Sequence, residues 1–186
     1  MFRSTLQLTR QLSDTLLELP AIVRQFERKS PQTMTDLMGW IGRSEDLLST
    51  HRLVEAAEVA GLKARILAPT FDNGKRETLR KRQQTVAIGL LHDLQQALQQ
   101  ALQPRALEVQ QARGMMRQLL QIVAQSGAVR YEPANGIEAM IDQVWALCIA
   151  HEQLKPLAAQ LRALLSKDDI RLLMAEEIDS LDFLAA

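Results

Sequence analysis

Residues 75–125 read KRETLRKRQQTVAIGLLHDLQQALQQALQPRALEVQQARGMMRQLLQIVAQ, and this stretch decides the fold. Its apolar side chains recur at steps of three and four residues, which is the spacing of a helix with one buried side. They form two stripes: Ala87, Leu91, Leu94, Leu98 and Ala101, then Val109, Ala112, Met116, Leu119 and Val123. Only Pro104 interrupts the pattern, and no Gly, Asn or Ser lies beside it to build a turn. The stretch is therefore either one long helix kinked at Pro104 or two helices that meet at residues 102–103.

The whole chain has the composition of a helical, globular protein. Its 186 residues, 47% of them apolar, are enough for one domain with a substantial core. Aromatic residues make up only 4%, so the core is predicted to be aliphatic. The single cysteine, Cys148, excludes an internal disulfide framework. The chain has no secretory signal and no apolar segment of about 18 residues, so we expect a cytoplasmic protein without a membrane span.

Helix start and stop signals divide the rest of the chain. Ser30-Pro31 is typical of a helix start, while residues 67–74 (LAPTFDNG) and 127–136 (GAVRYEPANG) are predicted loops. Pro20 and Pro156 are expected to kink or divide their helical segments. We predict an all-α fold, a bundle of six or seven helices in one domain covering residues 1–186. Within it, residues 1–68 can form an N-terminal subdomain, followed by the loop at 67–74 and a helical core at 75–186.

The three histidines, His51, His92 and His151, form no recognisable catalytic or metal-binding motif. Cys148 and His151 lie three residues apart on one predicted stripe and could supply two zinc ligands, but a zinc site needs two more. We therefore interpret the pair as a half-buried histidine beside a buried thiol, and not as zinc ligands. His92, which has the acidic neighbour Asp93, could also be an exposed histidine that accepts a phosphoryl group. The flanking residues contain no further signature of phosphotransfer. We therefore predict a non-enzymatic protein with no cofactor, no metal ligand and no catalytic residue.

Residues 53–67, LVEAAEVAGLKARIL, suggest a degenerate helix-turn-helix. In that motif a small residue packs the two helices and a glycine makes the turn four positions later, as Ala57 and Gly61 could do here. The recognition helix would begin near Leu62, and the basic cluster at 75–82 could bind phosphates. The apolar position expected near Thr70 is missing. A DNA-binding regulator is therefore the alternative function.

Charge is distributed unevenly along a chain whose net charge is zero. Cations are concentrated at the start of the central stretch: Lys75, Arg76, Arg80, Lys81 and Arg82. Acids are concentrated near the C-terminus: Glu176, Glu177, Asp179 and Asp182. Cations in the first turn of a helix oppose its dipole and favour a nearby anion. That anion could be the acidic segment of the same chain, the same segment of a second subunit, or a phosphate ligand.

These patterns predict a helical protein–protein interaction or regulatory module. The five clustered cations are the predicted contact for an anion or partner, and the four acids are the predicted acidic partner face. Stripes of Leu, Met and Ala repeated over many turns can form a seam between subunits, so a homo-oligomer is expected. A protein partner or a second copy is favoured over nucleic acid because the balancing acids are encoded in the same chain. No membrane partner is expected.

Overall fold

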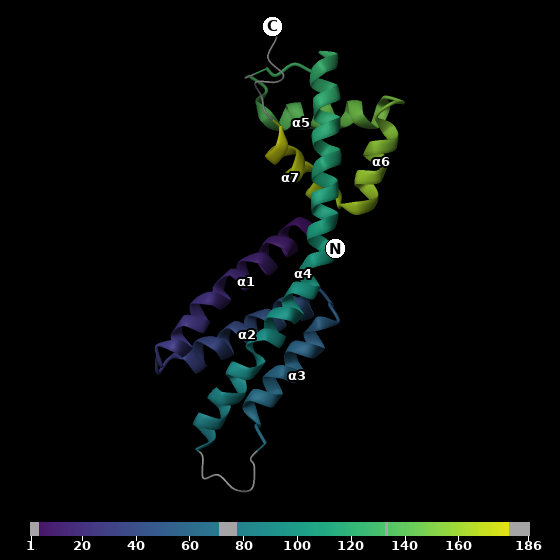
Figure 1. Ribbon diagram of the computed structural model, residues 1–186. Helices are drawn as coiled ribbons and strands as arrows, with labels where there is room; N and C mark the ends of the chain where they lie inside the picture. Colours follow the sequence, from purple (N-terminus) through teal and green to yellow (C-terminus); the bar gives the residue numbers. More distant parts are fainter. Residues whose placement is uncertain (1–3, 71–77, 133, 179–186) are drawn as a thin grey trace. The chain divides into compact units, whose positions relative to one another are not determined.

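The structure is a computed structural model that describes residues 4–70, 78–132 and 134–178. These residues form seven α-helices and no strand, which confirms the predicted all-α fold (Figure 1). In chain order the helices are α1 (Thr5–Glu27), α2 (Thr33–Thr50), α3 (Glu55–Leu67), α4 (Leu79–Ser126), α5 (Gly136–Ala150), α6 (Lys155–Leu164) and α7 (Lys167–Glu177). No helix in the described ranges is long and apolar enough to cross a membrane.

The central stretch is one helix, α4, which continues through Pro104. Of the two alternatives that the sequence left open, the single helix is the one observed. Pro104 lacks an N–H for the carbonyl oxygen of Gln100, but both residues are exposed, so water can replace the missing bond. Eight of the ten residues in the two predicted stripes are buried, and the other two, Leu91 and Val109, are half-buried. Pro20 likewise lies inside α1 and does not divide it.

The chain forms two compact units, each of which is described by itself. Unit 1 consists of Met1–Leu8 and Arg105–Ala186, and unit 2 consists of Thr9–Pro104. Both α1 and α4 therefore contribute residues to each unit. The boundaries differ from those of the subdomain suggested at residues 1–68, and the organisation as a single domain stays a prediction.

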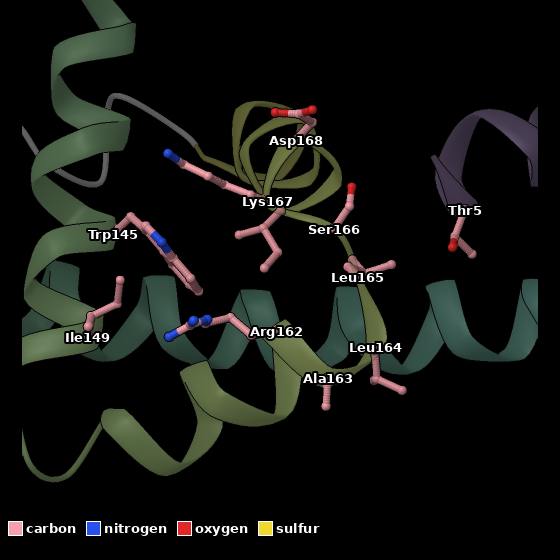
Figure 2. A pocket seen from close by; sticks show the side chains of 11 residues that line it. Thr5, Trp145, Ile149, Arg162, Ala163, Leu164, Leu165, Ser166, Lys167 and Asp168 are labelled. Atoms are coloured by element: carbon pink, nitrogen blue, oxygen red, sulfur yellow. The ribbon is translucent and has the colours of Figure 1, made fainter. Parts of the chain in front are cut away.

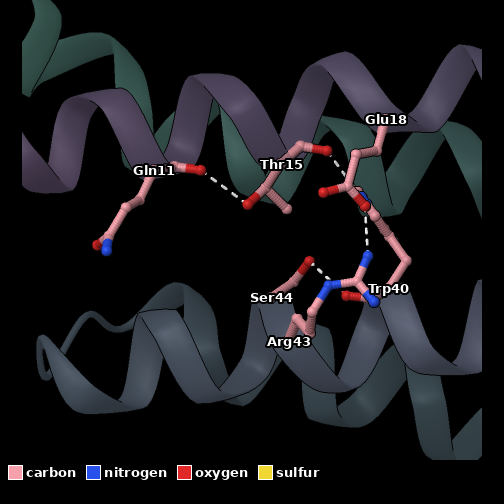
Figure 3. Close-up of polar contacts among 6 residues, drawn as sticks. All are labelled: Gln11, Thr15, Glu18, Trp40, Arg43 and Ser44. Carbon is pink, nitrogen blue, oxygen red and sulfur yellow. Dashed lines mark hydrogen bonds and ion pairs between the residues drawn. The ribbon is translucent and has the colours of Figure 1, made fainter.

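In unit 2, Trp40 anchors α2 against α1 (Figure 3). Its indole is fully buried, and its Nε1–H donates to the carbonyl oxygen of Thr15 at 2.7 Å. Beside it, Arg43 of α2 forms an ion pair with Glu18 of α1. The hydroxyl of Ser44 donates to the carbonyl oxygen of Trp40 at 2.8 Å, so this buried polar side chain has a partner within its own helix. The contact between α1 and α2 thus combines apolar burial with satisfied hydrogen bonds.

Unit 1 has an aliphatic core. It is built from the second part of α4, from α5, α6 and α7, and from Leu6 near the N-terminus. The fully buried members of this core include Met116, Leu119, Val144, Cys148, Leu161 and Leu173. Its aromatic neighbours, Tyr131 and Trp145, are only partly buried. The core is therefore aliphatic, as the composition predicts.

Two local predictions in unit 1 are wrong. α5 ends at Ala150, so His151 lies just beyond the helix and is exposed, not half-buried beside Cys148. Its Nδ1 accepts a hydrogen bond from the backbone N–H of Gln153 at 3.3 Å, within the turn that follows. Pro156 does not kink a helix but occupies the first turn of α6, where its missing N–H has no intrahelical partner to lose.

The start of α7 is connected to the N-terminal residues through Asp169. Ser166 is the N-cap of α7, and its hydroxyl oxygen accepts from the backbone N–H of Asp169 at 3.1 Å. The Asp169 carboxylate binds the start of a different helix, α1. It is only 1% exposed and accepts from the hydroxyl of Ser4 and from the backbone N–H of Thr5, the latter at 2.9 Å. Asp169 therefore caps the start of α1.

The thiol of Cys148 is buried, and this burial raises its pKa to about 11. Because the thiolate is the reactive form, iodoacetamide at near-neutral pH should alkylate the native protein about 100-fold more slowly than the unfolded protein. Mass spectrometry after timed labelling, with and without concentrated guanidinium chloride, measures both rates. Equal rates in the two conditions would contradict the burial of this thiol.

Candidate functional site

The described part of the predicted basic cluster lies at the start of α4. Arg80, Lys81 and Arg82 occupy the first turn, which contains no acidic residue. Arg80 and Lys81 are exposed, and Arg82 is half-buried. Lys75 and Arg76 lie outside the described residues. Three cations at the positive end of a helix dipole repel it, so an anion bound here would be stabilised.

Side-chain hydrogen bonds fix the place of this turn within unit 2. Nη2 of Arg80 donates to the carbonyl oxygen of Pro31 at 3.1 Å, in the turn between α1 and α2. Nε2 of Gln83 donates to the carbonyl oxygen of Leu67 at 3.1 Å, at the end of α3. The start of α4 therefore lies beside both the α1–α2 turn and the end of α3.

This arrangement brings a second basic segment, Arg28-Lys29, next to the cluster. α1 ends in a Schellman motif in which Lys29 adopts a left-handed conformation, with φ of 53°. Arg28 and Lys29 are exposed and lie three and two residues before Pro31, whose carbonyl oxygen binds Arg80. The contact predicted from the sequence did not include these two cations. Their proximity to α4 depends on the contact between Arg80 and Pro31, which lie 49 residues apart. A contact between such distant residues produces no pattern in the local sequence.

The basic end of unit 2 is defined here as Arg28, Lys29, Arg80, Lys81 and Arg82. Two of these five cations donate to neutral carbonyl oxygens: Arg80 donates to Pro31, and Nε of Arg82 donates to Thr70 at 3.0 Å. Within the described ranges, the side chains of Arg28, Lys29 and Lys81 form no hydrogen bond or ion pair. The described acids nearest in sequence are Glu27, beside Arg28 and Lys29, and Asp93, which follows Lys81 on α4. This surface therefore carries an excess of positive charge.

A small methionine-containing groove lies beside the basic end. It has a volume of about 370 Å³ and is lined by Met34, Thr35, Met38, Ile66, Leu67 and Gln83. Gln83, which lines the groove, directly follows the three cations of α4 in sequence, so the groove adjoins the first turn of this helix. Leu67 and Leu79 are each 52% exposed, which extends the apolar surface beyond the groove. Methionine side chains are flexible and polarizable, so such a groove can adapt to an apolar partner.

The predicted acidic face is engaged inside unit 1. Glu176 and Glu177 at the end of α7 form ion pairs with Arg113 and Arg117 of α4, with N···O distances of 2.9, 2.9 and 2.5 Å. The hydrogen bond and the charge of Glu177 raise the pKa of Arg117. The other two predicted acids lie outside the described residues: Asp179 and Asp182. The described acids are thus paired with two arginines one turn apart, which the sequence pattern did not single out.

The predicted helix-turn-helix is wrong in its local structure. α3 runs without a break through Gly61, so no turn forms there and no recognition helix begins at Leu62. Lys63, which that interpretation placed on the recognition helix, donates instead from Nζ to Oε2 of Glu45 in α2 at 2.7 Å. A glycine inside a helix costs only about 1 kcal/mol relative to alanine, so tertiary packing can maintain the helix through it.

The described residues contain no group of three or more His, Cys, Asp and Glu side chains arranged to hold a metal ion. His92 is exposed on α4, and His51 directly follows the end of α2. The surface with the clearest chemical character is therefore the basic end of unit 2 with its groove. No protein-family model, no curated protein and no solved structure matches this chain.

Proposed function

We propose that this protein is a non-enzymatic helical interaction module, and that the basic end of unit 2 and its methionine groove bind an acidic amphipathic helix of a partner protein. The observation that carries this proposal is the hydrogen bond from Arg80 to the carbonyl oxygen of Pro31. It joins two basic segments, distant in sequence, into one surface beside an apolar groove.

An acidic amphipathic helix matches both parts of this surface. Its apolar side chains would enter the groove between Met34, Met38 and Ile66, where burial provides affinity. Its carboxylates would face the cations of α4, where charge complementarity speeds association and sets orientation. They would also reduce the repulsion between those cations and the helix dipole.

Duplex DNA is the competing ligand for the same cations. Three observations favour a protein partner. The net charge of zero gives the chain no global field to attract a polyanion, and α3 is continuous where a recognition helix was expected to begin. The exposed side chains of Leu67 and Leu79 also match an apolar partner better than a phosphate backbone.

A labelled peptide with the sequence of residues 176–186, EEIDSLDFLAA, is a suitable probe because it combines four carboxylates with apolar side chains. In fluorescence anisotropy we expect saturable binding that weakens as salt rises from about 0.05 to 0.5 M, because salt screens exposed charges. Arg80→Glu with Lys81→Glu should weaken binding at least about tenfold, and Met34→Gln with Met38→Gln should weaken it as well.

Two controls make this titration decisive. Arg130→Glu reverses an exposed cation of unit 1 and should leave binding unchanged. A peptide with Asn and Gln in place of Asp and Glu tests whether the carboxylates are needed. Absence of peptide binding at low salt would overturn the proposal. Tighter binding of a 20-base-pair duplex, lost in the Arg80→Glu and Lys81→Glu variant, would establish the nucleic-acid alternative instead.

Because the probe is a segment of this chain, its binding would make a second copy one candidate partner, in competition with the ion pairs that Glu176 and Glu177 form with Arg113 and Arg117. Sedimentation equilibrium at micromolar concentration and moderate salt tests the proposed homo-oligomer. We expect an assembly larger than a monomer that dissociates with Arg80→Glu and Lys81→Glu. A monomer under these conditions would restrict the partner to a different protein.

A further inference from the structure

Unit 1 contains a cavity that is separate from the protein-binding surface proposed for unit 2. It has a volume of about 650 Å³ and is bounded by α5, the end of α6 and the start of α7. Its apolar lining includes Trp145, Ile149, Leu164 and Ile170, and its basic lining consists of Arg162 and Lys167. This volume lies within the range of about 300–1,000 Å³ that is common for small-molecule sites.

The charged side chains around this cavity are directed in a consistent way. Figure 2 shows the side chains of Arg162 and Lys167 extending toward Trp145, whereas the carboxylate of Asp168 points away from it. In the described part of the chain, the side chains of Arg162 and Lys167 form no hydrogen bond or ion pair. Other arginines of the same unit are paired, as Arg171 is with Asp142 at 2.5 Å. The two cations beside Trp145 are therefore available to a ligand.

The net charge of the lining favours a ligand with a single negative charge. Arg162, Lys167 and Asp168 are the charged residues that line the cavity, and together they leave one positive charge in excess. A guanidinium binds a carboxylate through two parallel hydrogen bonds, and an ammonium adds a point charge beside it. The half-buried indole of Trp145 and the 39% exposed side chain of Ile149 offer apolar surface next to these cations. A ligand that fits has an apolar body and one carboxylate.

We propose that this cavity binds a small apolar monocarboxylate. Its carboxylate lies between Arg162 and Lys167, and its apolar body packs on Trp145, Ile149 and Ile170. This site is independent of the protein-binding function proposed for unit 2, because it uses different residues in a different unit.

Decanoate is a simple probe, used below the concentration at which it forms micelles. The chain has two tryptophans, and their indole N–H signals can be followed together in ¹⁵N–¹H NMR spectra. We expect the Trp145 signal to shift saturably, while that of Trp40, which is buried in unit 2, stays in place. 1-Decanol and decylamine have the same apolar chain without the carboxylate, and each should bind at least about tenfold more weakly.

Variants of the two cations test the carboxylate contact directly. Arg162→Gln with Lys167→Gln should weaken decanoate binding at least about tenfold and leave 1-decanol binding unchanged. Both side chains are exposed, so the fold should be retained, and the two single variants should each show part of the loss. Arg130→Gln, at another exposed cation of unit 1, should have no effect. The proposal is overturned if decanoate does not bind, if it shifts both indole signals alike, or if its binding is indifferent to Arg162 and Lys167.

Discussion

Trp40→Ala is expected to lower the free energy of unfolding of unit 2 by about 3–5 kcal/mol, as observed for buried aromatic side chains replaced by alanine. The indole is fully buried and is the largest of the fully buried side chains. Its removal leaves a cavity between α1 and α2 and takes away the Nε1–H donor to the carbonyl oxygen of Thr15. Urea unfolding followed by circular dichroism measures the loss, and hydrogen exchange in α1 and α2 localises it.

Two further variants separate the causes of this loss. Trp40→Phe keeps most of the apolar volume but removes the donor, so we expect a smaller loss of about 1–2 kcal/mol. Leu17→Ala, at a position of α1 that is 76% exposed, should change stability by no more than about 0.5 kcal/mol. A loss below about 1 kcal/mol for Trp40→Ala would show that this indole does not anchor α2 on α1.

Asp169→Ala should destabilise unit 1 by about 2–3 kcal/mol, because hydrogen bonds to a buried charged group contribute more than neutral ones. The substitution leaves the Ser4 hydroxyl and the backbone N–H of Thr5 without their acceptor. It also removes a negative charge from the positive end of the α1 dipole. Thermal unfolding reports the loss of stability, and faster hydrogen exchange at Thr5–Leu8 is the specific sign of the lost cap.

Asp169→Asn and Asp168→Ala are the matched controls. The asparagine retains an acceptor for Thr5 and a donor for the Ser4 hydroxyl, so we expect a loss of about 1 kcal/mol. Asp168 is the exposed neighbour of Asp169, and its replacement should change stability by about 0.5 kcal/mol or less. If Asp168→Ala and Asp169→Ala are equally destabilising, the cap is not the source of the effect.

The parts of the fold that the sequence predicted correctly depend on local patterns. Stripes at steps of three and four residues identified the buried side of α4, because a helix repeats its faces at this interval. The N-cap at Ser166 is equally local, because its hydroxyl accepts from the backbone N–H of Asp169 within the first turn of α7. In both cases the residues that interact are close together in sequence.

The parts that the sequence did not predict depend on contacts between distant residues. The carboxylate of Asp169 accepts hydrogen bonds from Ser4 and Thr5, more than 160 residues earlier in the chain. The proximity of Arg28 and Lys29 to Arg80 likewise arises from tertiary packing. The periodicity of a sequence does not indicate which helix end contacts which turn. The sequence therefore predicted only the α4 cations of the basic end of unit 2.

The hydrogen bond between Ser4 and Asp169 joins residues 165 positions apart, and this separation has a consequence for synthesis on the ribosome. Unit 2 is one continuous segment, Thr9–Pro104, so its contacts can form while the remainder is still being translated. Leu6, by contrast, belongs to a core whose other members begin at residue 109 and include α7. At about 5–20 residues per second, the segment around Leu6 waits roughly 8–33 seconds for Asp169 to emerge. During this interval its apolar side chains are open to chaperones and proteases, and unit 1 completes its folding last.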